Sequence, residues 1–266
     1  MRPVVLGAAL LLAVAATGPA SAGMADRTGT TFGFMADDFI KAFQPFETLV
    51  VQVEGPTIYL DAGEATAAQP GQELVVFRKG EIFHHPVTGK PLGRYEEVLG
   101  YAQIRRVSPK FAEATFIPLP DKPPPAPEDG ARITRGRIRV AVTPVLNLTA
   151  ADADLRRVPY MLGTILERSK RFQVVDPLAV SDMLASSSVR VEDVLARPER
   201  ASRAATNLEV SGWIVPILLE RRGTTYLDVT WISAITGTAL FSRRHSLVPP
   251  GSAEEQRFPW EPRPED

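Results

Sequence analysis

Few residues in this sequence have the types and spacing that chemistry would require, and its histidines are the first to consider. His84 and His85 are adjacent, and the third histidine, His245, sits in a basic stretch. Neighbouring residues of a strand point to opposite faces, so His84 and His85 are poorly placed to bind one metal ion, even with Glu81 or Glu96 nearby. We therefore predict no metal site and no cofactor.

Carboxylates could act as a general acid and base, but no pair of them stands out. Asp152 and Asp154 lie near a predicted helix start, where acidic side chains interact favourably with the helix dipole. The sequence lacks a G-x-S-x-G elbow, a Walker loop, an H-E-x-x-H motif and a Rossmann glycine triplet. We predict no catalytic residue and a protein that is not an enzyme. A hydrolase with two carboxylates distant in sequence is the remaining alternative.

Arginine is the residue type that the carboxy-terminal half concentrates. The whole chain has 30 basic and 31 acidic residues, whereas residues 131–248 hold 17 Lys and Arg against 11 Asp and Glu, a net charge of about +6. A basic face formed by these residues could bind an envelope protein or an anionic envelope surface, and nucleic acid is not an expected partner. The alternative is a set of solvated helix and hairpin edges. The predicted partner-binding residues are Arg156, Arg157, Arg168, Lys170, Arg171, Arg221, Arg222, Arg243 and Arg244.

The amino terminus has the pattern of a cleavable secretory signal peptide over residues 1–22. A positive charge at Arg2 precedes an apolar run over residues 4–16, and the small-x-small sequence Ala20-Ser21-Ala22 marks the cut before Gly23. The run is shorter than the ~20 residues that span a bilayer. We expect a periplasmic protein that does not span the membrane after cleavage. The sequence has no cysteine, so we expect neither a lipoprotein nor a disulfide.

A proline-rich segment divides the rest of the chain. Six of the thirteen residues in 118–130, PLPDKPPPAPEDG, are proline, which predicts a stiff, extended, unpacked linker. It separates residues 44–117 from residues 131–248, and we expect each to close its own core. Residues 23–43 have too few apolar positions to fold alone, and we expect them to be poorly ordered. Residues 249–266 are predicted to be a disordered tail.

The first unit is predicted to be a small all-β barrel of the SH3-like kind. Short apolar stretches at 49–53, 57–60, 73–78, 101–107 and 111–117 are separated by Gly and Pro, which is typical of such barrels. We expect the chain to reverse at Lys79-Gly80.

The second unit alternates strands and helices. We expect strands at 137–142 and 172–175, a helix from about 158 to 166, and a second helix capped by Asp176-Pro177. A third helix at 199–207 precedes strands at 210–219, 226–234 and 238–247, joined by hairpins at Arg222-Gly223 and Thr236-Gly237. This pattern predicts an α/β sandwich with a mixed sheet and helices on one face, so the whole chain belongs to the α+β class.

Both units resemble known domains. Val53-Glu54-Gly55, the stretch Ile58-Tyr59-Leu60-Asp61 and above all residues 85–93, HPVTGKPLG, resemble the carboxy-terminal barrel domain of flagellar assembly protein T. The Pro and Gly residues of HPVTGKPLG also predict a tight protruding loop between two strands.

Three stretches of the second unit carry another resemblance. Residues 138–147 (IRVAVTPVLN), 172–176 (FQVVD) and 205–213 (ATNLEVSGW) are similar to the α/β domain shared by the amino-terminal part of TolB, the curli-secretion lipoprotein and flagellar outer-membrane proteins. Flagellar assembly protein T combines both domain kinds, in the opposite order.

These resemblances imply a non-catalytic, exported assembly or scaffold protein of the cell envelope, with the flagellum as one candidate structure. The alternative is a periplasmic binding module that regulates a peptidoglycan-synthesis or export machine, as domains like the second unit do in some relatives.

Overall fold

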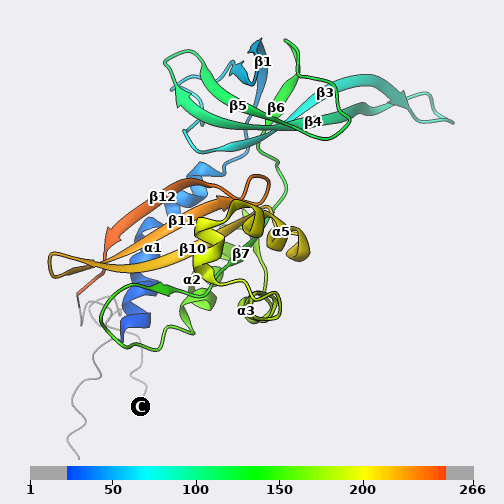
Figure 1. The fold of residues 1–266 in the computed structure, drawn as a ribbon. Helices are drawn as coiled ribbons and strands as arrows, with labels where there is room; N and C mark the ends of the chain where they lie inside the picture. Colours follow the sequence, from blue (N-terminus) through cyan, green and yellow to red (C-terminus); the bar gives the residue numbers. More distant parts are fainter. Residues whose placement is uncertain (1–22, 250–266) are drawn as a thin grey trace, which may run out of the picture.

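The computed structural model describes residues 23–249, so the predicted signal peptide and residues 250–266 of the predicted tail lie outside the described residues. Two units lie one above the other (Figure 1), a small barrel and a helix-flanked mixed sheet. The predicted α+β class is confirmed. No helix within residues 23–249 is both long and apolar enough to cross a lipid bilayer.

Six antiparallel strands close the barrel. They are β1 (Glu47–Glu54), β2 (Thr57–Leu60), β3 (Glu73–His84), β4 (Pro91–Val107), β5 (Ala112–Pro118) and β6 (Gly130–Arg132). Their order is β1-β2-β5-β4-β3-β6, and β6 pairs with both β1 and β3 to complete the ring. Alternate residues such as Leu74 and Val76 of β3 are buried, as the two-residue period of a strand requires.

The proline-rich segment differs from the unpacked linker that the sequence predicted. The Arg78 guanidinium pairs with the buried Asp129 carboxylate at 2.8 Å, and Val50 donates its N–H to the backbone oxygen of Asp129, also at 2.8 Å. The segment therefore returns to the barrel and delivers β6 as the closing strand. Residues 44–117 lack that strand, so the predicted boundary divides one barrel.

The second unit is a mixed sheet in the order β12-β11-β10-β7-β9. Strands β7 (Ile138–Val142), β9 (Phe172–Val174) and β10 (Gly212–Arg221) run parallel, and β11 (Thr224–Ser233) and β12 (Ala239–Ser246) continue it in antiparallel fashion. The short β8 (Leu146–Asn147) pairs with the outer half of β10. Both predicted hairpins are present.

Helices cover both faces of this sheet rather than the one face predicted. One face carries α1 (Met24–Ala42) and α2 (Val158–Arg168), and the other carries α3 (Pro177–Ser186), α4 (Val191–Ala196) and α5 (Pro198–Leu208). The central strand β7 shows why, because Val140 and Val142 join the core under α2 while Ala141 joins the core under α5. Parallel strands with apolar residues on both sides need a cover on both sides.

Residues 23–43, predicted to be poorly ordered, instead form helix α1. Phe32, Met35 and Phe39 recur at helical spacing and are buried, with Phe32 and Phe39 fully so. The ring of Phe39 lies 5.1 Å from that of Phe241 in β12, centroid to centroid. Most of the stability of helices in proteins comes from tertiary packing of an apolar face, and α1 packs its apolar face in this way.

The chain passes twice between the two units. It leaves α1 through Phe43, enters the barrel at β1, and returns after β6 through residues 133–137. Ile133 donates its N–H to the backbone oxygen of Phe46 at 3.0 Å, so the two passages lie side by side. One contiguous cluster of buried apolar residues runs from the barrel through these passages to α2 and the sheet.

Candidate interaction site: the arm formed by β3 and β4

Strands β3 and β4 continue beyond the barrel as a two-stranded ribbon (Figure 1), and residues 80–95 of this ribbon are called the arm here. The reversal predicted at Lys79-Gly80 is wrong, because β3 runs on to His84. A register shift between Lys79 and Ile82 absorbs an extra residue as a β-bulge instead of turning the chain. The predicted protruding loop at residues 85–93 contains the tip of the arm.

Two exposed aromatic side chains lie on one face of the arm. Phe83 and Tyr95 are 52% and 68% exposed. Each rests on a glycine of the opposite strand, Phe83 on Gly93 and Tyr95 on Gly80, with nothing bulkier between ring and backbone. One side of each ring therefore lies against the backbone of the opposite strand, and the other side lies in water.

Apolar side chains also occupy the other face and the end of the arm. Ile82 pairs across the ribbon with Arg94, on the face opposite the Phe83–Gly93 pair, and is 43% exposed. Val87 and Leu92, near the tip, are 86% and 57% exposed. Large apolar side chains gathered in this way on a protruding element are typical of interaction sites.

The tip is ordered by a histidine ring. The Nδ1 atom of His85 accepts hydrogen bonds from the N–H groups of Val87 and Thr88, both at 3.2 Å, and His85 donates its own N–H to Lys90 at 2.8 Å. Gly89 has a φ of +64°, which glycine adopts without steric cost. This histidine thus shapes the turn. Within residues 23–249 no three histidine or carboxylate side chains are grouped as metal ligands would be.

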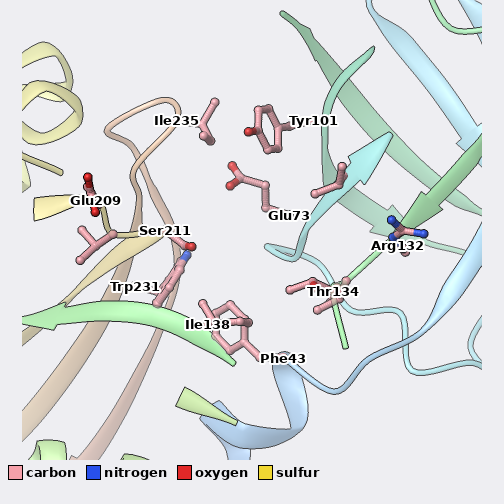
Figure 2. Close-up of a pocket in the computed structure, with 13 residues that line it drawn as sticks. Phe43, Glu73, Tyr101, Arg132, Thr134, Ile138, Glu209, Ser211, Trp231 and Ile235 are labelled. Carbon is pink, nitrogen blue, oxygen red and sulfur yellow. The ribbon is translucent and has the colours of Figure 1, made fainter. Parts of the chain in front are cut away.

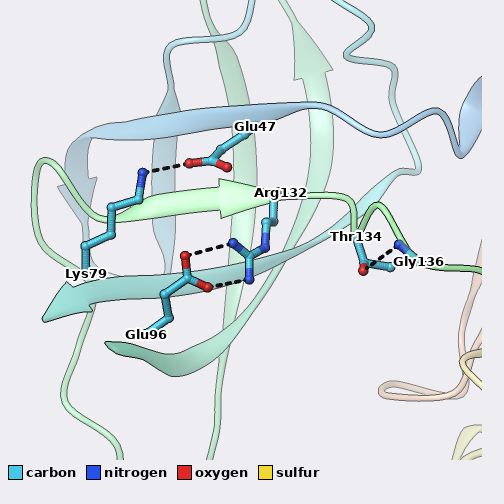
Figure 3. Close-up of polar contacts among 6 residues, drawn as sticks. All are labelled: Glu47, Lys79, Glu96, Arg132, Thr134 and Gly136. Atoms are coloured by element: carbon cyan, nitrogen blue, oxygen red, sulfur yellow. Dashed lines mark hydrogen bonds and ion pairs between the residues drawn. The ribbon is translucent and has the colours of Figure 1, made fainter. Parts of the chain in front are cut away.

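Ion pairs fix the base of the arm to the neighbouring strands (Figure 3). Arg132 of β6 binds Glu96 of β4 through two parallel hydrogen bonds of 2.6 and 3.0 Å, and Lys79 of β3 binds Glu47 of β1 at 2.8 Å. The Arg132 guanidinium lowers the pKa of Glu96, and it also lies 4.1 Å from the centre of the Phe77 ring. The arm therefore projects from a base that ion pairs hold in place. Less conformational entropy is then lost when the arm binds a partner.

The nine predicted partner-binding residues differ in burial and in pairing. Arg171 is buried, contrary to prediction, because its guanidinium bonds to backbone oxygens between the two units. Four others pair with carboxylates of the chain: Arg156 with Asp154, Arg157 with Asp26, Arg243 with Asp38 and Arg244 with Asp228. The remaining four are exposed and have no side-chain partner within residues 23–249: Arg168, Lys170, Arg221 and Arg222.

The sequence signalled the arm only in part. The loop between the strands was evident from Pro86, Gly89 and Pro91. The exposure of the apolar residues beside the loop was not evident, because Ile82 and Phe83 also fit the apolar pattern of a strand that packs inside a barrel. Ile82 and Phe83 are exposed because β3 and β4 continue to pair with each other beyond the end of the barrel, where no other strand covers them.

Comparisons with known proteins give limited likenesses. No protein-family model matches the chain, and neither does any curated protein. A solved LpoB C-terminal domain from Escherichia coli aligns at 16% identity over 44% of this chain and 86% of that one, with a TM-score of 0.37. The lipoprotein GNA1162 from Neisseria meningitidis aligns at 14% identity over 43% and 83% of the two chains, with a TM-score of 0.33.

Likenesses at these TM-scores carry no argument about function. The matches described here include no flagellar protein, so the flagellar resemblance is not shown by them. The Neisseria protein is a lipoprotein by its description, whereas the present sequence contains no cysteine.

Proposed function

We propose that this protein is an exported, non-catalytic binding protein of the cell envelope, and that the arm is its contact with a folded protein partner. The observation that carries the proposal is the pair Phe83 and Tyr95, held on glycines and exposed on a ribbon with a braced base. Aromatic side chains buried at the centre of an interface are among the residues that most often dominate binding energy.

The distribution of apolar groups favours a protein groove over a membrane surface. An element that lies on a bilayer needs one apolar face and one polar face. The arm carries Phe83 and Tyr95 on one face and Ile82 on the other, so a flat surface could cover only one set. A groove with two walls would cover both.

The envelope location rests on the predicted signal peptide, which lies outside the described residues. Two roles follow from binding at this location. A scaffold would hold its partner in a larger structure, and a regulator would change the activity of a machine such as one that synthesises peptidoglycan. Both require the arm, and they differ in what happens to the partner.

The test is site-specific photocrosslinking from position 83 in the producing cell, with position 34 as the control. Phe34 of α1 is 57% exposed, close to the 52% of Phe83, but lies outside the arm. A protein crosslinked from position 83 and not from 34 would then be purified, and its affinity measured for the wild type and for Phe83→Ser/Tyr95→Ser.

We expect the double substitution to weaken binding at least about tenfold, since two buried aromatic anchors at an interface cost ~2 kcal/mol or more when truncated. Phe34→Ser should leave the affinity unchanged. Equal binding by all three proteins would refute the arm as the contact. Binding to lipid vesicles that needs Phe83 and Tyr95, without a protein crosslink, would assign the arm to a membrane instead. An assay of the partner's activity with and without the wild type separates regulation from scaffolding.

A further inference from the structure

A cavity of about 260 Å³ opens where the barrel meets the mixed sheet (Figure 2). Glu73 and Tyr101 line it from the barrel, while Ser211 and Trp231 line it from the sheet. This volume corresponds to about nine water molecules at ~30 Å³ each, which suits a ligand of up to roughly that number of non-hydrogen atoms. The cavity and the arm lie at opposite ends of β3, and Arg132 is the residue they share, since it lines the cavity and also pairs with Glu96 at the base of the arm.

One side of the cavity is aromatic and buried. The rings of Phe43 and Trp231 lie 4.5 Å apart, centroid to centroid, and the two residues are only 6% and 3% exposed. Ile133 and Ile138 extend the same apolar lining. Aromatic rings present a negative face, which attracts organic cations.

Glu73 supplies an uncompensated carboxylate. Its Oε2 atom accepts hydrogen bonds from Gln103 Nε2 at 2.9 Å and from Ser233 Oγ at 2.7 Å. Its Oε1 atom accepts none from the described residues, and the carboxylate extends from the barrel toward the Ser211 and Trp231 side of the cavity (Figure 2). Burial raises the pKa of Glu73, and no lysine or arginine is near enough to offset that effect.

The remaining charged groups of the lining leave this excess of negative charge in place. Arg132 is the one basic residue of the lining, and its guanidinium is bound by Glu96, which does not line the cavity. Glu209 adds a second carboxylate at the sheet side. A partly buried carboxylate that accepts hydrogen bonds but has no cation beside it is costly to keep charged unless a counter-ion or a proton neutralises it.

We infer that this cavity binds a small organic ammonium ion, with Glu73 as its counter-ion and the Phe43–Trp231 pair as its apolar wall. An ammonium group would donate a hydrogen bond to the free Oε1 atom and would pair with the carboxylate charge. The attached carbon atoms would fill the apolar part of the cavity. A bare divalent metal ion fits less well, since it requires six or more oxygen ligands and most of this lining is apolar.

The experiment uses the whole chain and a matched pair of probes, n-butylammonium and n-butanol, which share a shape and differ in charge. Binding is measured by calorimetry and by tryptophan fluorescence, to which Trp231 of the lining contributes. The decisive variant is Glu73→Gln, which keeps an acceptor for Gln103 and Ser233 and so preserves the fold while it removes the charge. Glu64→Gln is the control, because Glu64 is exposed and lies outside the cavity. Ser211→Phe, at the exposed rim, should block the cavity without altering Glu73.

We expect the wild type and Glu64→Gln to bind butylammonium and not butanol. Glu73→Gln should weaken that binding about tenfold or more, the effect of losing a charge-assisted contact in a partly buried site. Ser211→Phe should weaken it as well. Equal affinity for butylammonium and butanol would overturn the inference, as would equal affinity of the wild type and Glu73→Gln. Absence of binding at about 10 mM butylammonium, weaker than the millimolar range of small ligands, would also overturn it. None of these outcomes depends on the arm.

Discussion

Arg171, directly after α2, donates a hydrogen bond from Nε to the backbone oxygen of Phe43, at the end of α1. Its two terminal nitrogens donate to the backbone oxygens of Gly136 and Thr134, the latter at 2.6 Å. One buried guanidinium therefore holds both passages of the chain between the barrel and the sheet. Burial lowers the pKa of Arg171, but an arginine keeps its charge at physiological pH.

Replacing Arg171 with Met should strongly destabilise the protein. The substitution leaves three backbone oxygens without their donor, but only the bond to Phe43 is fully buried, while Thr134 and Gly136 are exposed and their oxygens can be hydrated. An unsatisfied buried acceptor costs about 1–3 kcal/mol, so we expect a loss in that range. Urea unfolding followed by tryptophan fluorescence measures it. The control is Arg168→Ser, an exposed position where we expect a change within about 0.5 kcal/mol. A loss under about 1 kcal/mol for Arg171→Met would show that the passages do not depend on this residue.

Arg171 also shows which features local sequence can predict. The three charged residues Arg168, Lys170 and Arg171 looked alike as a basic edge, yet only Arg171 is buried. Its acceptors lie 35, 37 and 128 residues away in the chain, so no local pattern could distinguish it. By contrast, the predicted helix start at Asp176-Pro177 is local and is confirmed, because Asp176 accepts the N–H of Leu178 at 2.9 Å.

The same reasoning explains the two larger differences between the sequence-based prediction and the structure, which are helix α1 and the packing of the proline-rich segment. The apolar spacing of Phe32, Met35 and Phe39 is legible in the sequence, but the surface of β12 and α2 that covers it is assembled from residues 115 or more positions away. The proline-rich segment has the composition of a spacer. It packs because Arg78 provides a partner for Asp129 and β1 and β3 leave an open edge for β6. Strand and helix periods were therefore predictable, and the partners of each element were not.

The two units should unfold together. One buried apolar cluster spans both, so residues 23–249 are expected to show a single cooperative transition by far-UV circular dichroism and by fluorescence. Fragments 44–117 and 131–248 should lack sigmoidal melts, because the first has no β6 and the second has no α1. This reverses the expectation of two independent cores. Two separated transitions in the intact chain, or a sharp melt of either fragment, would contradict it.

The stability of the wild type relative to Glu73→Gln should depend on pH. The raised pKa means that the folded state holds the proton of Glu73 more tightly than the unfolded state, whose ordinary value is 4.5. The stabilising effect is complete below pH 4.5 and is lost as the pH rises through the folded-state pKa. Burial raises the pKa of Tyr101, which also lines the cavity, and the charge of Glu73 raises it further.

We therefore expect Glu73→Gln to match the wild type at low pH and to become the more stable protein as the pH rises above 4.5. Denaturant unfolding in phosphate or acetate, without amine buffers, measures the difference at each pH. Glu64→Gln, measured in parallel, should show no such trend. A constant difference across the pH range, or one that favours the wild type at high pH, would contradict the assignment of an uncompensated carboxylate.

Substituting a paired arginine should destabilise the protein more than substituting exposed, unpaired ones. Arg244 binds the Asp228 carboxylate at 2.6 and 3.0 Å, and Asp228 is only 7% exposed, so Arg244→Ser leaves a largely buried charge without its cation. We expect a loss on the order of 1–2 kcal/mol, reduced from the cost of a fully buried pair because Arg244 itself is half exposed. Arg221→Ser/Arg222→Asn should change stability by less than about 0.5 kcal/mol. Asparagine suits the left-handed conformation of position 222, where φ is +52°.

If an acidic partner contacts the β10–β11 hairpin, the Arg221→Ser/Arg222→Asn double substitution should lower the association rate of that partner at low salt and have little effect at high salt, measured by surface plasmon resonance. An association rate indifferent to salt and to both changes would leave Arg221 and Arg222 as solvated residues of the hairpin.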